Sequence, residues 1–269
     1  MTQSLAYVHP EAKIGQNVII EPFAYVAKDV EIGDGTWIGP HAVIFDGAKI
    51  GKNCRIFPGA VIAGIPQDLK FVGEKTTAEI GDNTTIRECV TVSRGTKAVG
   101  KTVVGSNCLI MAYSHVAHDC VVGDHVIMSN GSFIAGEVTL GDWAILSGGV
   151  MVHQFVHVGS HVFISGGSLV HKDVPPFVMA AREPLSYVGI NVVGLRRRGF
   201  TPEQINLIQD VYRFLYQSSM NNSDALKAIE EQIAPSQYRD EIIDFVRNSS
   251  RGIMRGFKSS NNSSDSGDI

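Results

Sequence analysis

The sequence lacks the features that mark membrane, secreted and nucleic-acid-binding proteins. No segment approaches the run of about 18 apolar residues that a membrane-spanning helix requires. Residues 1–5 have neither the basic nor the apolar region of a secretory signal peptide. The net charge of -4 disfavours general binding to nucleic acid. We therefore expect a cytoplasmic protein that neither spans a membrane nor binds nucleic acid.

Cysteine is also scarce, and its spacing carries no metal-binding signal. The chain has 4 cysteines, at positions 54, 89, 108 and 120, without the paired spacing of metal ligands. We interpret them as reduced thiols that serve mostly as small residues in the wall of the fold.

What the sequence has instead is an apolar residue at every sixth position along most of its length. Neither an α-helix, with a period of 3.6, nor a strand, with a period of 2, produces a strict six. A short strand followed by a turn does. A smaller residue often follows four positions later, and Gly, Asp and Asn fill the turns, as in residues 32–35. The apolar series is Val8, Ile14, Ile20, Val26, Ile32, Ile38, Ile44, Ile50, Ile56, Ile62, Ile80, Ile86, Val92, Val104, Ile110, Val116, Val122, Met128, Ile134, Leu140, Leu146, Val152, Val158, Ile164 and Val170.

Three hexads make one triangular coil of 18 residues, with the large aliphatic side chain pointing into the prism. Coils stack at the spacing of neighbouring strands, roughly 4.8 Å, so that each coil covers the previous one. The repeat therefore predicts a mainly β protein, a parallel β-helix of hexapeptide repeats. The hand of the helix does not follow from the repeat.

Two insertions break the repeat, at residues 63–78 and 94–102, and insertions in a solenoid often carry the binding site. The repeat ends at Val174-Pro175-Pro176, because proline cannot continue a ladder of hydrogen bonds. We expect residues 1–190 to form the β-helix, 191–257 an irregular connection and a C-terminal α-helical domain, and 258–269 a disordered tail.

The helical domain carries its own start signals. Thr201, Pro202 and Gln204 have the spacing of an N-cap, a first helical residue and a capping box. We expect Ser223 or Asp224 to cap a second helix, and a third helix to begin near residue 236.

The densest candidate site is the segment from residue 114 to 120. Because Val116 points inward, we expect His115, His118 and Asp119 to point outward near one corner of the prism. An imidazole titrates near neutrality, and a neighbouring carboxylate can orient it and raise its basicity, so the group suits acid–base work. The alternative is a polar turn without chemical function.

Adding 18 residues moves up one coil, which places other residues on the same corner. His118 lies beneath Gly136, and Gly136 lies beneath Gln154, with His153 beside it. Gly136 has no side chain, so its backbone N–H can approach a ligand closely. A positioned N–H beside a general base is what a developing oxyanion requires, and the corner therefore predicts an acyl-transfer site.

Two further groups are candidates for substrate contacts. Asp68 and Lys70, in the first insertion, could bind sugar hydroxyls and a diphosphate, although a solvated loop is the alternative. Asn191 and the arginines at positions 196–198 lie in the connection, and guanidinium groups match the geometry of phosphate. Consecutive basic residues are also common on solvated surfaces.

Several short motifs accompany the hexads and together resemble one family, the cytoplasmic acyl-carrier-protein-dependent UDP-N-acetylglucosamine O-acyltransferases of lipid A biosynthesis. The resemblance covers about residues 5–256. Its motifs are Gln67-Asp68-Leu69-Lys70, Ile86-Arg87-Glu88, Arg94-Gly95-Thr96, His115-Val116-Ala117-His118-Asp119-Cys120, Val152-His153-Gln154-Phe155, Asp173-Val174-Pro175-Pro176, Gly189-Ile190-Asn191, Arg197-Arg198-Gly199-Phe200 and Ser250-Arg251-Gly252.

The resemblance implies a left-handed β-helix, a homotrimer of parallel prisms, and sites in the clefts between subunits. It implies transfer of a 3-hydroxyacyl chain from acyl-carrier protein to the 3-hydroxyl of UDP-N-acetylglucosamine, the first step of lipid A biosynthesis, without metal, cofactor or acyl-enzyme.

The same resemblance implies a role for each candidate residue. The catalytic group would comprise a general base, the carboxylate that orients it and the oxyanion donor: His118, Asp119 and Gly136. Contacts to the nucleotide sugar or acyl donor would be Asp68, Lys70, His115, His153 and Gln154. Contacts reaching the nucleotide from a neighbouring subunit would be Asn191 and Arg197 or Arg198.

The chain departs from the family at two positions. Glu137 stands where the family often has His, and Val193 where it often has Glu. Both lie near the expected sugar nucleotide, so a 3-amino analogue of the sugar remains an alternative acceptor.

Alternatives of other classes also remain. One is a metalloenzyme similar to γ-carbonic anhydrase, which would use His115, His118 and His153, and another is a non-enzymatic scaffold. The related N-acyltransferases carry an extra domain before the prism, and we expect none because the hexads begin at Val8.

The acyl chain needs an apolar groove along the prism, which we expect to run from the His118 corner toward Phe163 and Gly166. Gly166 lies one coil above Gly148, which leaves a strip without side chains. A strip of this kind can admit methylenes, so we expect a chain of about 12 to 16 carbons. A large side chain there would end the groove, and each excluded methylene would forfeit roughly 0.8 kcal/mol of burial.

Overall fold

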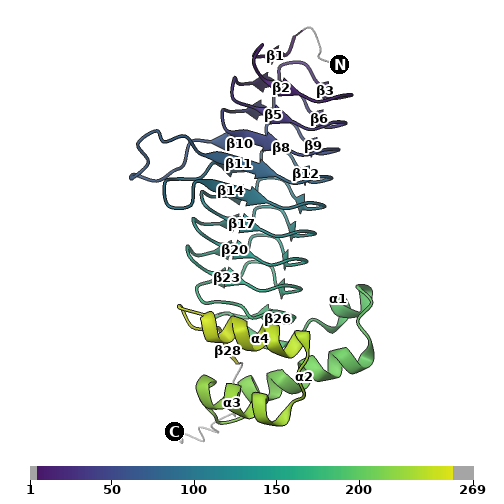
Figure 1. Ribbon diagram of the computed structural model, residues 1–269, viewed down its shortest axis with the longest axis vertical. Helices are drawn as coiled ribbons and strands as arrows, with labels where there is room; N and C mark the ends of the chain where they lie inside the picture. The colour runs from purple at the N-terminus through teal and green to yellow at the C-terminus, as the bar shows by residue number, and fades with distance from the viewer. Residues whose placement is uncertain (1–4, 257–269) are drawn as a thin grey trace, which may run out of the picture.

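The computed structural model describes residues 5–256 as a long three-sided prism with a small helical domain at its C-terminal end (Figure 1). The predicted tail, residues 258–269, lies outside the described residues. No helix within residues 5–256 is both long and apolar enough to cross a membrane.

The prism has three parallel sheets, and the chain visits them in turn. The first sheet contains β1 (Tyr7–Val8), β4 (Tyr25–Val26), β7 (Val43–Ile44), β10 (Val61–Gly64), β13 (Thr91–Ser93), β16 (His115–Val116), β19 (Phe133–Ile134), β22 (Met151–Val152) and β25 (Leu169–Val170). The second contains β2 (Lys13–Ile14), β5 (Glu31–Ile32), β8 (Ala48–Ile50), β11 (Thr77–Ile80), β14 (Lys101–Val104), β17 (Val121–Val122), β20 (Thr139–Leu140) and β23 (His157–Val158). The third contains β3 (Ile19–Ile20), β6 (Trp37–Ile38), β9 (Arg55–Ile56), β12 (Thr85–Ile86), β15 (Leu109–Ile110), β18 (Ile127–Met128), β21 (Ile145–Leu146), β24 (Phe163–Ile164), β26 (Val178–Ala181), β27 (Ser186–Ile190) and β28 (Arg255–Gly256).

The sixth-position residues fill the interior, which confirms the predicted parallel β-helix. Val116 pairs with Ile134, and Ile134 with Val152, so each step along a sheet is one coil. Ile38 and Ile110 have no exposed surface. Burying an aliphatic side chain of this size contributes roughly 1.5–3 kcal/mol, so the repeat itself stabilises the prism along its length.

We name each corner of the prism by the sheets that it joins. Both insertions leave the prism at the first–second corner, one between β10 and β11 and the other between β13 and β14 (Figure 1, left). They pack on each other: the Arg94 guanidinium lies 5.4 Å from the centroid of the Phe71 ring, and the Lys97 N–H donates to Glu74 Oε1 at 2.9 Å. The corner that carries His118 is therefore also the corner that carries both loops.

The C-terminal end is more regular than the sequence predicted. After Pro176, where the hexads end, the chain forms an antiparallel pair, β26 and β27, and the connection expected to be irregular begins with a short helix, α1 (Val192–Arg197). It is followed by α2 (Pro202–Gln217), α3 (Asn222–Gln232) and α4 (Gln237–Asn248).

The helix start signals were mostly right. Thr201 caps α2 with a complete capping box, and Ser236 caps α4, both as predicted. The predicted cap of α3 is wrong: Asn221 takes that place and accepts a hydrogen bond from the Asp224 N–H at 2.9 Å. Asn is an equally good capping residue, and it stands two residues before Ser223 and three before Asp224.

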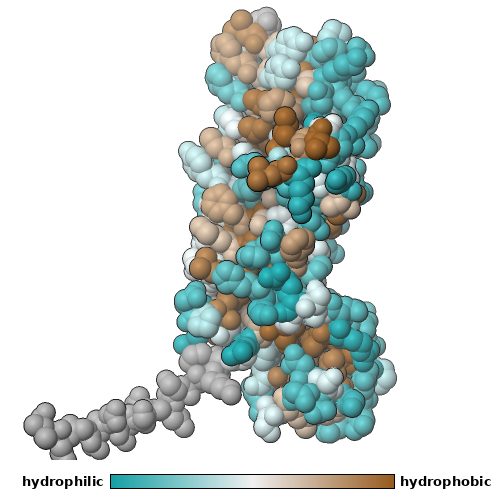
Figure 2. All heavy atoms as spheres, turned by 90° about the vertical axis from the view of Figure 1, so that its left-hand side faces the viewer, coloured by the Kyte–Doolittle hydropathy of each residue, from teal (hydrophilic) through white to brown (hydrophobic). Residues whose placement is uncertain are grey.

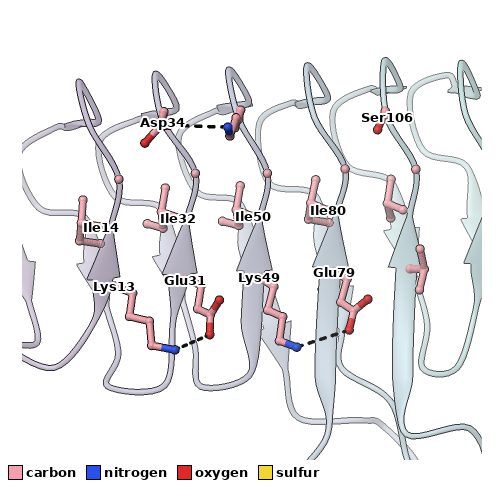
Figure 3. Close-up of a pocket in the computed structure, with 18 residues that line it drawn as sticks. Lys13, Ile14, Glu31, Ile32, Asp34, Lys49, Ile50, Glu79, Ile80 and Ser106 are labelled. Atoms are coloured by element: carbon pink, nitrogen blue, oxygen red, sulfur yellow. Dashed lines mark hydrogen bonds and ion pairs between the residues drawn. The ribbon is translucent and has the colours of Figure 1, made fainter.

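The outer faces of the three sheets differ in chemistry. On the second sheet, a row of alternating charges begins with Lys13 and Glu31 at 2.8 Å and continues with Lys49 and Glu79 at 3.7 Å (Figure 3). The outward rows of the other two sheets are mainly apolar, and on the side that bears the loops, hydrophobic groups stand among hydrophilic ones (Figure 2). The outward residues of the first sheet are Tyr7, Tyr25, Val43, Val61, Thr91, His115, Phe133, Met151 and Leu169; those of the third are Ile19, Trp37, Arg55, Thr85, Leu109, Ile127, Ile145, Phe163 and Met179.

Candidate active site

His118 and Asp119 lie on the first–second corner, in the turn between β16 and β17. The His118 Nδ1 lies 2.9 Å from Asp119 Oδ2. A carboxylate only accepts hydrogen bonds, so Nδ1 carries the ring proton and Nε2 keeps a free lone pair. The His118 side chain is 18% exposed, which leaves the ring partly open at the surface of the corner. This is the geometry of a general base with an orienting carboxylate.

The sequence suggested that Asp119 points outward, and this is wrong: its side chain has no exposed surface. The second insertion folds back over it. The Thr96 N–H donates to Oδ1 at 2.9 Å, and the Thr96 hydroxyl donates to Oδ2 at 2.6 Å. The Asp119 N–H in turn donates to the Thr102 hydroxyl at 2.8 Å. The carboxylate therefore has three donors and one fixed orientation.

Gly136 lies directly against the His118 ring, one coil above it, as the 18-residue step predicted. A Cβ at Gly136 would stand 2.6 Å from His118 Cε1 and 2.7 Å from Nε2, closer than carbon atoms in proteins approach. Only glycine leaves room for the ring in this position. Within the described residues, the Gly136 N–H has no hydrogen-bond acceptor, so it is available to a ligand beside Nε2.

His115 is the outward residue of β16 and lies on the same coil as His118. Its Nδ1 lies 2.7 Å from the Thr91 hydroxyl. Burial lowers the pKa of His115 below its ordinary value of 6.5, a contact with Thr91 opposes this, and the neighbouring His118 adds to the lowering. A neutral imidazole suits a hydrogen-bond partner for an uncharged substrate group.

His153 and Gln154 lie two coils above His118 on the same corner, and both are exposed. The His153 Nδ1 lies 3.1 Å from the Gln154 carbonyl oxygen and 3.4 Å from Arg251 Nη2. The structure thus brings together His115, His118, Gly136, His153 and Gln154 along one edge of the prism.

Asp68 and Lys70 lie in the first insertion, which leaves the same corner below His118. Asp68 Oδ1 accepts a hydrogen bond from the Lys70 N–H at 2.9 Å, which shapes the loop locally. Asp68 is half-buried and Lys70 is exposed, so the ammonium group is free to meet a ligand.

Asn191 and the arginines lie at a different corner, the second–third. Asn191 is buried; its amide donates to the His161 carbonyl oxygen at 3.0 Å, and its Oδ1 caps α1. Arg198 donates to the Trp143 carbonyl oxygen at 3.1 Å and covers the Trp143 ring. Arg197 is exposed. Within one chain, these residues do not meet His118.

The structure also separates the two residues expected at the acyl chain from the His118 corner. Phe163 is an outward residue of the third sheet, and Gly166 lies in the third–first corner, where its Cα would carry a Cβ 3.1 Å from the Gly148 carbonyl oxygen. Within one chain, the groove expected from the His118 corner toward Phe163 and Gly166 would therefore have to cross from one corner of the prism to another. Residue number gives the height of a residue along the prism axis, whereas the corner that it occupies depends on its place within the coil of 18 residues.

Two contributors to the site were not singled out as site residues from the sequence. Thr96 holds the orienting carboxylate, and Arg251 reaches His153 from the C-terminal segment. Neither has a periodic signal, because each acts through a loop or segment that folds back on the prism. In the part of the chain that the structure describes, no group of three or more His, Cys, Asp and Glu residues is arranged to hold a metal ion.

Comparison with protein families finds two matches. Residues 173–254 match the family described as "Udp N-acetylglucosamine O-acyltransferase; Domain 2". Residues 11–46, 29–64 and 101–136 match the bacterial transferase hexapeptide, six repeats.

Similar curated proteins and solved structures agree with these matches. An acyl-[acyl-carrier-protein]–UDP-N-acetylglucosamine O-acyltransferase from Chlorobaculum parvum is 63% identical over 193 residues, 71% of this chain and 73% of the relative. The protein of the same name from Sulfurihydrogenibium is 57% identical over 249 residues, 92% of each chain. The structure of a UDP-N-acetylglucosamine acyltransferase from Bacteroides fragilis matches with a TM-score of 0.94 and 53% identity, covering 95% of this chain and 100% of that one.

Proposed function

Because the chain belongs to the UDP-N-acetylglucosamine O-acyltransferase family, we propose that it transfers a 3-hydroxyacyl chain from acyl-carrier protein to the 3-hydroxyl of UDP-N-acetylglucosamine. This is the first step of lipid A biosynthesis and takes place in the cytoplasm. The observation that carries the mechanism is the contact between the His118 ring and Gly136, with Nδ1 held by the buried Asp119.

The reaction needs a proton acceptor and a stabiliser of negative charge, and the corner supplies both. His118 Nε2 removes the proton of the 3-hydroxyl as the sugar oxygen bonds to the thioester carbon. The Gly136 N–H stabilises the negative charge that develops on the carbonyl oxygen. The carbon–sulfur bond then breaks, and the carrier thiolate takes the proton from His118. Asp119 stabilises the imidazolium between these two steps.

Other residues of this corner bind the substrates. His115, His153 and Gln154 contact the nucleotide sugar or the acyl donor, and Asp68 and Lys70 reach them from the loop. Glu137 follows Gly136 in the same turn, with its N–H bonded to the His118 carbonyl oxygen at 3.1 Å. A carboxylate there is compatible with a hydroxyl or an amine on the acceptor sugar, so the 3-amino analogue is the competing substrate.

The active molecule is a homotrimer, and the chemistry of the outer faces supports this. The first and third sheets present mainly apolar outward rows, whereas the second presents charges in its N-terminal half, from Lys13 to Lys101, and continues with Val103, Val121, Thr139 and His157. A ring in which the first sheet of each prism packs on the third sheet of the next buries both apolar faces and leaves the charged one in solvent.

Such a ring explains why the candidate residues lie on different corners. The outer edges of each interface are the first–second corner of one prism and the second–third corner of its neighbour. Asn191, Arg197 and Arg198 of the neighbour then approach the nucleotide, and Phe163 and Gly166 of the neighbour line the path of the acyl chain inward between the sheets. Each cleft needs two subunits.

Mass spectrometry of the product tests the reaction. The protein is incubated with UDP-N-acetylglucosamine or its 3-amino analogue and with a panel of 3-hydroxyacyl carrier proteins. The expected product is the sugar nucleotide carrying one ester-linked acyl chain. The proposal fails if neither sugar gains an acyl group, and an exclusive amide product would favour the 3-amino sugar.

Subunit mixing tests the shared cleft. The expected mass in light scattering is three times the 29.1 kDa of the chain. Inactive His118→Ala subunits mixed with inactive Arg197→Ala subunits should regain activity after exchange, because some clefts then contain both native groups. A monomer of full activity would rule out the trimer.

A further inference from the structure

The segment after α4 lies across the last turn of the first–second corner, above His153. Asp173, in that turn, is fully buried and holds the segment. Its Oδ2 accepts from the Ser249 hydroxyl at 2.6 Å, its N–H donates to the Gly252 carbonyl oxygen at 3.2 Å, and its carbonyl accepts from the Met254 N–H at 2.8 Å. The backbone around Arg251 is therefore fixed on the prism at the end of the catalytic corner.

From this fixed backbone, the Arg251 side chain reaches two groups of the corner. Its Nε and Nη2 each lie 3.4 Å from the His171 carbonyl oxygen, and Nη2 lies 3.4 Å from His153 Nδ1. The His171 and His153 rings are neighbours, with centroids 5.7 Å apart. A side chain of the helical domain thus contacts a residue that we place at the substrate.

The two neighbours of His153 Nδ1 require opposite protonation states of this nitrogen. The Gln154 carbonyl oxygen, at 3.1 Å, can only accept a hydrogen bond, which requires a proton on Nδ1. The Arg251 guanidinium can only donate, which requires a lone pair on Nδ1. A neutral imidazole satisfies one of them, and the choice decides whether Nε2 is a donor or an acceptor.

The segment around Arg251 creates this competition, because it brings the guanidinium to His153 and takes the N–H that would otherwise bond to the Gln154 carbonyl oxygen. In the lower coils, the His118 carbonyl accepts from the Glu137 N–H and the Gly136 carbonyl accepts from the Phe155 N–H, both at 3.1 Å. By the same 19-residue spacing, the Gln154 carbonyl would accept a hydrogen bond from the Asp173 N–H. That N–H donates to the Gly252 carbonyl oxygen instead. Gln154 is exposed, so water can satisfy its carbonyl. The guanidinium never loses its proton, and hydrogen bonds from a charged donor are the stronger ones.

We propose that Arg251 is a positioning residue that keeps Nδ1 of His153 unprotonated, so that Nε2 carries the ring proton and donates to the substrate. The inference rests on the proposed function only for the identity of the substrate; the state of the ring is a property of the protein alone. The corner then holds two imidazoles in opposite tautomers. His118 presents a lone pair that takes a proton, and His153 presents an N–H that binds.

Nitrogen NMR of the histidine side chains tests the tautomer directly. The full-length protein is labelled with ¹⁵N in its histidine rings, and the His153 signals are assigned by their loss in His153→Asn. The expected spectrum shows a proton on Nε2 of His153 in the native protein and on Nδ1 in Arg251→Met, with His118 unchanged. A native His153 protonated on Nδ1, or a tautomer that does not respond to Arg251→Met, overturns the proposal.

Kinetics test the consequence. Arg251→Met should lower kcat/KM roughly tenfold, the value of one hydrogen bond, mainly through KM. On a His153→Ala background the same change should cost almost nothing, because the residue through which it acts is gone. Arg251→Lys, which keeps a charged donor, should recover part of the loss. Arg247→Met, in the same domain and away from the corner, is the matched control.

An equal loss from Arg251→Met with and without His153 would show that Arg251 acts otherwise, for example by holding the segment in place. If no variant has activity while the tautomer still switches, the positioning role stands and the proposed substrate is wrong.

Discussion

Two corners of the same prism carry histidines, and the rings are packed differently on each. On the first–second corner, His118 lies beneath Gly136, whose missing side chain leaves the ring open. On the second–third corner, His125 lies beneath Trp143 with ring centroids 4.0 Å apart, and Trp143 lies beneath His161 at 6.3 Å. The residue in the next coil therefore decides whether a histidine ring stays open to a ligand or is covered by a stacked ring.

The charged groups beside His118 and His161 also differ. His118 Nδ1 meets a buried carboxylate, which can stabilise a positive charge on the ring. His161 meets the Arg198 guanidinium and stacks on the Phe177 ring at 5.6 Å. Burial lowers the pKa of His161 to about 4, and the charge of Arg198 adds to the effect. Burial and the Arg198 charge therefore oppose protonation of His161.

Among the variants that test this comparison, His118→Ala should cause the largest loss of turnover. Loss of a general base lowers turnover by roughly 10² to 10⁴. His125→Ala, on the other corner, should cost at most a few-fold, because its ring only stacks. Turnover is measured with both variants confirmed as folded by circular dichroism. Equal losses would mean that the corners are not distinct.

The next largest loss of turnover is expected from Gly136→Ala, which should displace the His118 ring. The added methyl would stand 2.6 Å from His118 Cε1, so the ring must move, and misplacement of a reacting group by about 1 Å can cost about 10²-fold. Gly64→Ala is the control, because its methyl would meet its nearest atom at an ordinary 3.8 Å. Comparable rates for the two alanine variants would show that the glycine above His118 is not required.

Asp119→Asn tests the tether of His118 and should slow the reaction less than His118→Ala. The carboxylate orients the ring and stabilises the imidazolium but does not itself take the substrate proton, so part of the turnover should remain. Thr96→Val, which removes one of the donors to the carboxylate, should have a smaller effect in the same direction. A greater loss from Asp119→Asn than from His118→Ala would mean that the roles are misassigned.

The smallest effect concerns stability at the second–third corner. Since the pKa of His161 falls from 6.5 to about 4 on folding, the unfolded chain binds a proton in this window that the folded chain does not. Stability should therefore decrease as the pH falls from about 6.5 to about 4. His161→Phe, which cannot be protonated, should reduce that decrease by a few degrees in Tm. A native Tm whose pH dependence matches that of the variant would contradict this.

The prism could be predicted from the sequence because its determinant is local and repeated. Outside the two insertions, each sixth residue from Val8 to Val170 has the same packing requirement, and the 18-residue step then placed Gly136 against His118 correctly. The hand of the helix could not be predicted, because a hexad specifies a turn and not its sense. For Phe163 and Gly166, the step gives height along the axis, whereas a site between prisms depends on how copies pack.

The parts of the site that were missed lie outside the repeat. Asp119 was expected to face outward, and it is buried because residues 94–102 fold back over it. Arg251 meets His153 across 98 positions of sequence through a segment docked on Asp173. Contacts of this kind depend on tertiary structure, and no periodicity reports them.

Chemical rescue of His118→Ala by free imidazole tests the central claim most directly. Removing the side chain opens a space beside Gly136 and Asp119 that an imidazole molecule can enter as the proton acceptor. The account predicts that added imidazole restores part of the turnover in a saturable way, while His125→Ala and the native protein do not respond. A folded His118→Ala protein whose turnover stays unchanged at every imidazole concentration would contradict the assignment of His118 as the base.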